Sequence, residues 1–379
     1  MTKSGDVMVT DAFQKAWDDV RGEVGRFNLA IFGKSGVGKS TLINAIFGAE
    51  VAETGIGRPV TQHDHLYVTE TGSLGIFDTR GLEVGAENDR ILAELREYIG
   101  AMRRKPVEDQ IHLAWYCVRA GDNRFEDTEA EFVQALSELG LPVLAVMTQV
   151  EQRNGVYHPS AVELIQHIED RALPVGDDRV FPTMALADDF RGLQEHGLKE
   201  LLDATFRHAP DAVAEALTAA QVIDEERKKE AVKEAISLGV GLASAAGASP
   251  IPFSDAVVLV PIQMSMLARI AHIRGVEFDQ ATAATLTLTA ASTAAGRTLV
   301  TNLLKMVPGG GTLIGGTISS AVAGAITWSM GQAWDLVCKK LVAGEVPIVD
   351  GALKSDVVRD LFVTEFKSQI AKARPKGGK

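Results

Sequence analysis

Short apolar runs alternate with amphipathic stretches over the first 209 residues. Apolar runs bounded by turn residues predict strands, and apolar residues at three- and four-residue spacing predict helices. The runs that predict strands lie at 27–33, 65–68, 74–77, 112–118, 142–147 and 180–182. The stretches that predict helices begin near residue 39 and lie around 87–104, 126–139, 159–171 and 197–208. Such alternation predicts an α/β fold, with a mostly parallel sheet and helices on both faces.

The two flanks of this region also have a helical pattern. Apolar residues at helical spacing within residues 1–25 predict an amphipathic helix that lies against the domain that follows. Residues 210–234 predict a helical linker, and the charged run within them is interpreted as a solvated face. At 379 residues the chain is longer than one core usually holds, so we expect two domains. The first of them is predicted to span residues 26–209.

The C-terminal half predicts an all-α domain over residues 235–370, followed by a basic tail at 371–379. Three stretches contain no Asp, Glu, Lys or Arg and are rich in Ala, Gly, Ser and Thr: 235–254, 281–296 and 306–334. Residues 312–334 are long enough to cross much of a bilayer, and the small-residue spacing of Gly311 with Gly315 and Ser320 with Gly324 is typical of packed membrane helices. Reversible membrane contact or a buried hairpin in a soluble bundle would have the same pattern.

Composition narrows the class of protein. A hydrophobic fraction of 46% predicts a folded chain, and a net charge of −12 argues against nucleic acid as a partner. Cys117 and Cys338 fall in apolar segments, which favours reduced, buried thiols in a cytosolic protein. The first residues lack the long apolar run of a secretory signal. We therefore expect a cytoplasmic protein, with a peripheral membrane location as a further option.

A phosphate-binding motif lies between the first predicted strand and the helix that follows it. The sequence GKSGVGKS fits the pattern GxxxxGK[ST], in which glycines turn backbone amides toward phosphate oxygens. Lys39 would reach the outer phosphates, and the Ser40 hydroxyl would bind Mg²⁺. The residues predicted to bind the nucleotide here are Gly33, Lys34, Ser35, Gly36, Val37, Gly38, Lys39, Ser40 and Thr41.

Two further segments complete a predicted magnesium site. LGIFDTRG places Asp78 at the end of a predicted strand, where its carboxylate would hold Mg²⁺ through water, and Gly81 where its amide would meet the γ-phosphate. Thr61, in GRPVTQ, lies between the motifs where a switch threonine would complete the metal shell. The predicted metal ligands are therefore Ser40, Thr61 and Asp78.

The segments GKSGVGKSTLINAIFG, GRPVT and FDTRGLE resemble the Era-like and immunity-related branch of the translation-factor GTPases, over about residues 25–209. The resemblance implies a P-loop GTPase domain that binds GTP and GDP. In that family an Asn/Thr-Lys-x-Asp motif reads the base, and the matching stretch here is Thr148, Gln149, Val150 and Glu151. Glu151 would accept hydrogen bonds from guanine N1 and N2, whereas Gln149 replaces the family's lysine. Ala185 would donate its amide to the guanine oxygen.

Hydrolysis needs a positioned water, and the residue after Gly81 is Leu82 rather than the glutamine of Ras-like enzymes. Arg58 precedes Thr61 by three residues, the spacing of an arginine supplied in cis, although a solvated loop arginine has the same spacing. Lys39, Thr61, Gly81 and Arg58 are thus the predicted catalytic residues. His63 and His65 are interpreted as ordinary strand histidines rather than a metal pair, because no third ligand accompanies them.

Residues 238–342 resemble a helical domain of unknown function attached to some bacterial Era-like GTPases. The predicted function is that of a GTPase switch, which hydrolyses GTP slowly unless assembly or a partner activates it. The switch would reposition the helical domain against a membrane or protein partner, with a homodimer formed through the nucleotide-binding domain. The alternatives are a nucleotide-binding scaffold with negligible turnover and, because Gln149 departs from the base-reading motif, an ATPase.

Overall fold

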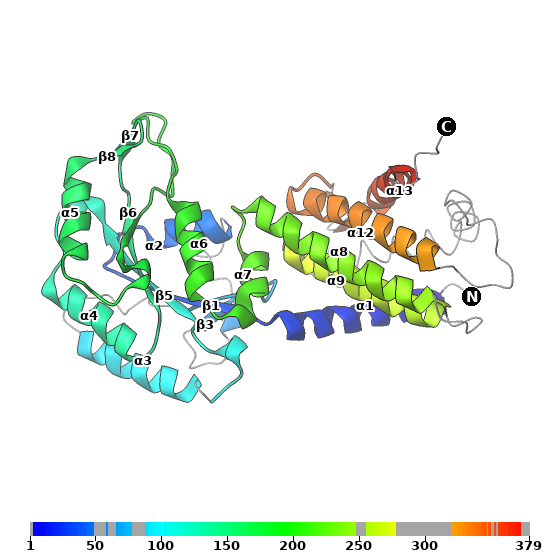
Figure 1. The fold of residues 1–379 in the computed structure, drawn as a ribbon, viewed down its shortest axis with the longest axis horizontal. Helices are drawn as coiled ribbons and strands as arrows, with labels where there is room; N and C mark the ends of the chain where they lie inside the picture. The colour runs from blue at the N-terminus through cyan, green and yellow to red at the C-terminus, as the bar shows by residue number, and fades with distance from the viewer. Residues whose placement is uncertain are drawn as a thin grey trace. The chain divides into compact units, whose positions relative to one another are not determined.

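The computed structural model describes residues 3–48, 58–59, 66–77, 88–102, 104–247, 255–277, 320–346, 348–349, 352–353 and 355–372. The chain forms two compact units. One comprises residues 24–225, and the other comprises residues 1–23 together with 226–379. Figure 1 labels the helices and strands of both units.

A seven-stranded sheet forms the centre of the 24–225 unit, in the order β2-β3-β4-β1-β5-β6-β9. Its strands are β1 (Phe27–Phe32), β2 (Arg58–Pro59), β3 (Leu66–Val68), β4 (Leu74–Phe77), β5 (Leu113–Arg119), β6 (Val143–Thr148) and β9 (Val180–Pro182). The four pairings from β4 through β1, β5 and β6 to β9 are parallel, and β2 and β3 join at one edge in antiparallel pairings. The prediction of a mostly parallel sheet is therefore confirmed.

Helices cover both faces of this sheet. They are α2 (Lys39–Phe47), α3 (Asn88–Met102), α4 (Asp127–Glu138), α5 (Pro159–Glu169), α6 (Leu198–His208) and α7 (Ala214–Ala220). Successive residues of a strand point to opposite faces, and β5 shows the consequence. The Trp115 ring stacks on Phe47 of α2 at 5.8 Å between centroids, whereas the next residue, Tyr116, packs against Phe132 of α4 at 6.1 Å. Phe132, Val133 and Leu136 of α4 belong with Tyr116 to one buried hydrophobic cluster.

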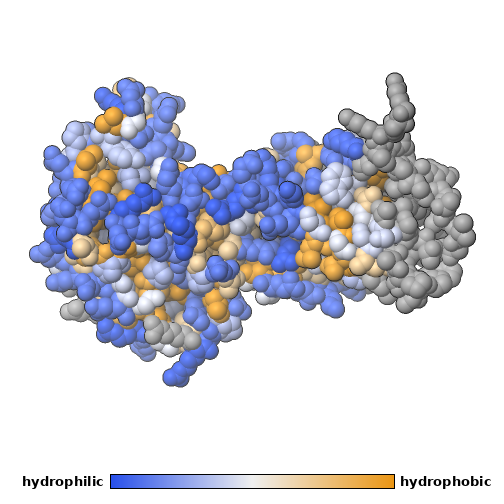
Figure 2. Space-filling view, viewed as in Figure 1, coloured by the Kyte–Doolittle hydropathy of each residue, from blue (hydrophilic) through white to orange (hydrophobic). Residues whose placement is uncertain are grey.

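The compact α/β unit extends past the predicted boundary at residue 209 to Glu225. Ala216 and Leu217 of α7 are fully buried, and the Val222 amide donates to the carbonyl of Ile46 in α2 at 2.9 Å. Most of the stretch expected to be a linker is therefore part of this unit. The apolar residues at 210–224 have helical spacing. This spacing predicts a helix but does not show which surface the helix packs against. Polar residues cover most of the α/β unit on the face drawn in Figure 2.

Five helices form the described part of the second unit: α1 (Lys3–Val24), α8 (Glu225–Gly247), α9 (Asp255–Arg274), α12 (Ser320–Val342) and α13 (Ser355–Lys372). A short hairpin joins β10 (Ile348–Val349) to β11 (Ala352–Leu353). The N-terminal helix was expected to lie against the α/β domain that follows it, and this expectation is corrected. Trp17 meets the His272 ring of α9 edge-on at 6.1 Å, and Arg269 of α9 pairs with Glu23 at 3.5 Å.

Small residues let the helices of this unit approach closely. A Cβ atom at Gly331 of α12 would lie 2.7 Å from Ile236 of α8, and one at Gly324 would lie 2.5 Å from the Ser244 hydroxyl. Ser320 also donates to the Ser244 carbonyl at 2.7 Å. Residues 312–319, including Gly315, and the preceding Gly311 lie outside the described residues. Among the helices that the structure describes, none is long and apolar enough to span a membrane.

Candidate nucleotide-binding site

Glycines determine the shape of the loop between β1 and α2, where the phosphate motif was predicted. Gly33 has φ of 133°, and a Cβ atom there would lie 2.3 Å from the carbonyl oxygen of Cys117 in β5. Gly36 and Gly38 also have positive φ, of 74° and 95°. Because side chains with a Cβ rarely adopt such angles, these positions require glycine. The loop therefore lies directly against the end of β5, and Cys117 itself is a buried, free thiol.

The start of α2 is suited to an anion. Helix α2 begins at Lys39, and no side chain caps its first amides, because Gly38 occupies the preceding position. Uncapped amides at a helix N-terminus carry partial positive charge and bind phosphate. The Lys39 ammonium donates to the carbonyls of Gly33 and Lys34, both at 2.8 Å, and so lies within the curve of the loop. Ser40 and Thr41 are exposed at this helix end.

The remaining predicted loop residues divide between solvent and core. Ser35 and Gly36 are exposed, whereas the side chain of Val37 is buried at 2% exposure. Val37 therefore contributes its backbone to the loop surface, and its side chain fills the space below. The prediction that this segment is a strand, loop and helix is confirmed.

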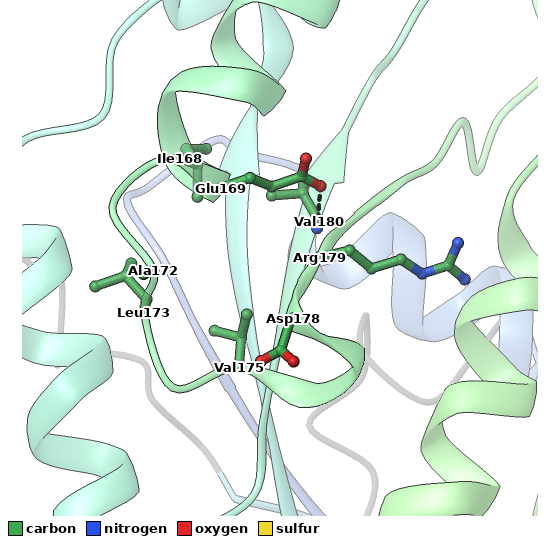
Figure 3. Close-up of a pocket in the computed structure, with 8 residues that line it drawn as sticks. All are labelled: Ile168, Glu169, Ala172, Leu173, Val175, Asp178, Arg179 and Val180. Carbon is green, nitrogen blue, oxygen red and sulfur yellow. Dashed lines mark hydrogen bonds between the residues drawn. The ribbon is translucent and has the colours of Figure 1, made fainter.

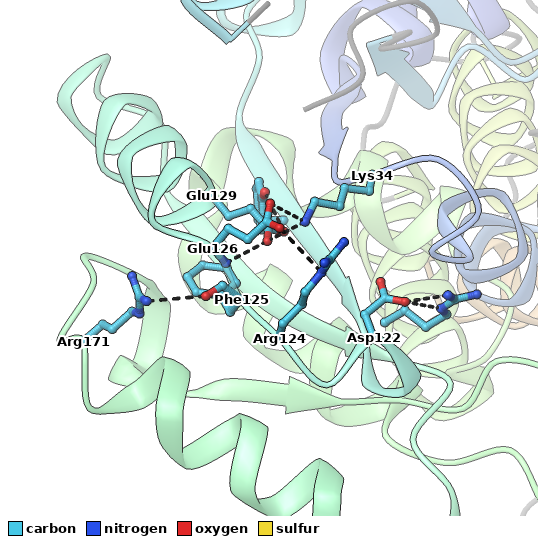
Figure 4. A network of polar contacts seen from close by, with 9 residues as sticks. Lys34, Asp122, Arg124, Phe125, Glu126, Glu129 and Arg171 are labelled. Atoms are coloured by element: carbon cyan, nitrogen blue, oxygen red, sulfur yellow. Dashed lines mark hydrogen bonds and ion pairs between the residues drawn. The ribbon is translucent and has the colours of Figure 1, made fainter. Parts of the chain in front are cut away.

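A network of charged side chains ties the loop to α4 (Figure 4). The Lys34 ammonium lies 2.9 Å from carboxylate oxygens of both Glu126 and Glu129. The Glu129 carboxylate is buried, with 3% of its side chain exposed, and also accepts from the Tyr116 hydroxyl at 3.3 Å and from the Glu126 amide at 3.0 Å. The side chain of Lys34 is thus directed to α4, and only its backbone faces Lys39.

The network affects the ionisation of its members. Partial burial lowers the pKa of Lys34, but hydrogen bonds and charges from Glu126 and Glu129 outweigh it, so the pKa is raised above its ordinary value. The same hydrogen bond from Lys34 lowers the pKa of Glu126. Sequence reasoning missed both carboxylates. Their three-residue spacing at the start of the predicted helix fits a capping box in which Glu126 takes the position usual for Ser or Thr, and the structure has this box at the start of α4.

The predicted base-reading segment follows β6 and adjoins the phosphate loop. The Thr148 hydroxyl donates to the Val37 carbonyl and approaches the Val118 carbonyl at 3.3 Å, so it joins the ends of β5 and β6 to the loop. Gln149 adopts a positive φ of 55°. The side-chain nitrogen Nε2 of Gln149 lies 3.3 Å from the position that a Cβ atom would take at Gly38. Two of the predicted site segments, the phosphate loop and residues 148–151, therefore meet at the carboxyl ends of parallel strands.

Glu151 lies further along the same segment. It contacts the connection between β9 and α6, residues 183–197, which contains Ala185. The Glu151 carboxylate forms an ion pair with Arg191, a residue that sequence reasoning did not single out. Ala185 follows Met184, whose backbone is bonded in both directions to His196. The predicted acceptor and donor for the base thus belong to two segments that contact one another. No local sequence signal marks the partnership of Arg191 with Glu151, since 40 residues separate them.

Several predicted residues lie outside the described part of the chain: Thr61, His63, His65, Asp78, Gly81 and Leu82. The backbone of Arg58 is described, in β2 opposite Val68, but its side chain is not. Of the three predicted magnesium ligands only Ser40 is therefore placed. Within the described residues, no group of three or more His, Cys, Asp and Glu side chains could hold a metal ion.

A separate pocket of about 190 Å³ lies at the amino end of β9 (Figure 3). Glu169 at the end of α5 accepts the Val180 amide there at 3.0 Å, so its carboxylate closes the start of the strand. The phosphate loop follows the carboxyl end of β1, and β9 runs in the same direction as β1 through β5 and β6. The pocket therefore lies at the amino ends of the parallel strands, whereas the candidate nucleotide site lies at their carboxyl ends.

Comparison with known proteins adds family evidence. Residues 28–149 match the family model described as 50S ribosome-binding GTPase. GTPase Era of Coxiella burnetii (strain Dugway 5J108-111) is 24% identical over 234 residues, which cover 61% of this chain and 70% of Era. GTPase Der of Leuconostoc citreum is 30% identical over 194 residues, which cover 49% of this chain and 38% of Der. A crystal structure of an Aquifex aeolicus Era variant bound to GDP.AlF4- aligns with a TM-score of 0.34 at 18% identity, over 61% of this chain and 70% of that one.

The segment matched by the family model lies within the α/β unit. The 28–149 segment is of the P-loop GTPase type found in Era and Der, which supports guanine-nucleotide binding. The matched segment begins in β1 and ends at Gln149, so it includes the phosphate loop and the start of the base-reading segment. It ends before Glu151 and before the 183–197 connection, where this chain has the ion pair to Arg191.

Proposed function

We propose that the chain binds GTP with Mg²⁺ and hydrolyses it to GDP and phosphate, as a cytoplasmic switch of the Era-like type. The geometry of the phosphate loop carries this proposal: glycines at positive φ, uncapped amides at the start of α2 and the Lys39 ammonium within the curve. The match of residues 28–149 to a GTPase family model supports guanine nucleotide as the ligand.

Each part of the loop has a role in phosphate binding. The amides from Gly33 to Thr41 would surround phosphate oxygens, and the positive end of α2 favours their charge. Lys39 would exchange the carbonyls of Gly33 and Lys34 for outer phosphate oxygens. Because that exchange replaces two neutral acceptors with charged ones, the new hydrogen bonds would be stronger.

Magnesium fits the donors proposed for it. Ser40, Thr61 and Asp78 supply hydroxyl and carboxylate oxygens, the donor type that Mg²⁺ prefers, and the exposed Ser40 hydroxyl adjoins the uncapped amides. Bound Mg²⁺ would neutralise charge on the outer phosphates. Lys39, the Gly81 amide and Arg58 would stabilise the negative charge of the transferring phosphoryl group. Leu82 has no group that can orient water, and this favours completion of the site by a second molecule.

We further propose a guanine-reading end. Thr148 and Gln149 would hold the phosphate loop against the base-reading segment, and Glu151 would accept hydrogen bonds from the guanine N1 and N2 groups. Ala185 would donate its amide to the guanine oxygen. An adenine base has no hydrogen on N1, so it would leave the carboxylate of Glu151 without a donor.

The proposed output passes through the helical unit. Helix α8 begins at Glu225, where the α/β unit ends, so the two units share a continuous connection. Leu238 and Leu242, one turn apart on α8, have exposed fractions of 55% and 49%, which supports a membrane or protein partner for this unit. We propose that the nucleotide state alters this contact and that a homodimer through the nucleotide-binding unit raises turnover.

The test is GTP hydrolysis per molecule over a range of protein concentrations, with and without anionic liposomes. Wild type is compared with Lys39→Ala, with Lys105→Ala as a matched control that removes an exposed lysine outside the site. Turnover that rises with concentration or lipid and disappears only in Lys39→Ala would support the proposal. Tight GTP binding with negligible turnover under all conditions would leave a scaffold, and hydrolysis of ATP in preference to GTP would indicate an ATPase.

A further inference from the structure

Residues 183–197, between β9 and α6, form an ordered hairpin rather than an open loop. Met184 and His196 exchange backbone hydrogen bonds of 3.0 and 3.1 Å near its base. Asp188 and Leu193 exchange bonds of 3.0 and 2.9 Å nearer the tip. Gly192 turns the chain at the tip with φ of 67°. We call residues 183–197 the base-edge hairpin.

Three contacts attach the base-edge hairpin to the segment 148–151. The Val150 amide donates to the Thr183 carbonyl at 3.0 Å. His196 approaches the Val150 carbonyl with Nε2 at 2.8 Å, so this nitrogen must carry a proton and donate. The third contact is the ion pair between Arg191 at the tip and Glu151. The first two contacts fix the backbone of the segment, and the third restrains the Glu151 side chain.

The restraint matters because Glu151 stands where the family motif has aspartate. Glutamate has one more rotatable bond than aspartate, so an unrestrained side chain samples more conformations and loses more entropy when it binds a base. The backbone of Arg191 is held, since its amide donates to the Asp188 carboxylate at 3.1 Å. From this fixed backbone the planar guanidinium forms the ion pair that restricts the placement of the Glu151 carboxylate.

We propose that Arg191 is a specificity-determining positioning residue, which holds the Glu151 carboxylate where both its oxygens meet the N1 and N2 hydrogens of guanine. Only one oxygen of Glu151 contacts Arg191, and each carboxylate oxygen accepts two hydrogen bonds, so the pair and the base can be bound together. The proposal rests on the proposed guanine site. In this chain a glutamate positioned by Arg191 would thus do what the shorter aspartate of the family motif does without such support.

Inosine triphosphate separates this role from simple charge attraction. ITP has the N1 hydrogen of guanine but lacks the 2-amino group, so it uses one carboxylate oxygen rather than two. Loss of carboxylate placement should weaken GTP more than ITP, whereas loss of a positive charge near the phosphates should weaken both equally. Arg153, exposed in β7 of the neighbouring β7–β8 hairpin (Gln152–Arg153 and Val156–Tyr157), provides a matched charge control.

The experiment measures dissociation constants of GTP, ITP and ATP for the full chain and its variants by equilibrium titration with Mg²⁺. We expect Arg191→Ala to weaken GTP about threefold to fivefold, the range of a partly exposed ion pair, and to weaken ITP less than about twofold. Arg191→Lys should keep part of the GTP preference, and Arg153→Ala should leave the GTP to ITP ratio unchanged. In a Glu151→Ala background, Arg191→Ala should have no further effect on GTP.

Equal weakening of GTP and ITP by Arg191→Ala, persisting in the Glu151→Ala background, would overturn the inference and leave the proposed function standing. An unchanged GTP to ITP ratio in Arg191→Ala would do the same. Wild-type protein that binds ATP as tightly as GTP would instead overturn the proposed guanine site, and the inference with it. A circular dichroism spectrum identical to wild type verifies that each variant is folded.

Discussion

At the phosphate end of the candidate site the backbone itself forms the binding surface, whereas at the base end exposed side chains would contact the ligand. Gly33 contacts the backbone of β5 so closely that no side chain fits. Glu151 and Arg191, in contrast, expose 36% and 56% of their side chains. A substitution in the phosphate loop should therefore either leave phosphate binding intact or abolish it. Substitutions at the base end should change the preference for guanine by degrees. Substitutions at both ends of the site test that difference.

Gly33→Ala should produce the largest effect. The new Cβ atom would clash with the Cys117 carbonyl, and the φ angle of the native loop is one that alanine rarely adopts. We therefore expect the unfolding free energy to fall by about 3 kcal/mol or more and GTP binding to be lost. Urea unfolding and nucleotide titration measure both. Gly100→Ala is the control, since a Cβ atom in that exposed position of α3 meets nothing. Near-normal GTP affinity in Gly33→Ala would contradict a loop shaped by its backbone.

Lys34→Met should have the next largest effect, because it leaves the buried Glu129 carboxylate without its cation. Breaking a buried pair costs about 3 to 5 kcal/mol, and the 26% exposure of Lys34 reduces the expected loss to about 1 to 3 kcal/mol. Thermal unfolding measures it. Lys34→Arg, which keeps the charge, should lose less. If Lys34→Met weakened GTP binding but left stability unchanged, Lys34 would act on the phosphate directly rather than through α4.

The folding stability of the α/β unit should depend on pH through His112. This dependence limits the pH at which nucleotide affinities at the phosphate end and the base end can be compared. Burial lowers the pKa of His112, whose Nδ1 accepts the Asn28 amide at 2.8 Å while Nε2 contacts the Val107 carbonyl at 2.7 Å. Below pH about 6.5 the unfolded chain binds a proton that the folded chain resists, so stability should fall with pH by up to about 1.4 kcal/mol per unit.

Unfolding followed between pH 7.5 and 5 checks this dependence. His112→Asn removes the titrating ring and should flatten the slope below pH 6.5, whereas the exposed His158→Asn should not. A slope unchanged by His112→Asn would assign the acid sensitivity to other groups. Nucleotide affinities of the two ends are best compared above pH 7, where the contribution of His112 is complete.

Thr148→Val should have the smallest effect and connects the two ends. The substitution keeps the shape of the side chain but removes the hydrogen bond to the Val37 carbonyl, at an expected cost of about 1 kcal/mol in stability. GTP and ITP affinities should fall together, because the phosphate loop is displaced and the base contacts are not. A selective loss of GTP over ITP in Thr148→Val would contradict the separation of the two ends. Thr148→Ser, which keeps the hydroxyl, is the control.

Local patterns were sufficient for most of the α/β unit. The runs at 74–77 and 180–182 coincide with β4 and β9, and the glycine-rich motif lies between a strand and a helix as predicted. The periodicity of residues 1–25 predicted the helix but assigned it to the wrong neighbour, because an apolar stripe does not specify its partner. Tertiary pairs across long separations were missed for the same reason: Lys34 with Glu129 and Glu151 with Arg191.

The buried contact between Lys34 and Glu129 also restricts how this chain can diverge. A neutral residue at position 34 would leave the buried Glu129 carboxylate as an uncompensated charge, whereas a neutral residue at position 129 would leave Lys34 paired with Glu126. Descendants of this sequence should therefore keep Glu129 only where position 34 keeps a cation. Position 129, far from the nucleotide in the chain, would then carry a record of what the phosphate loop contains at position 34.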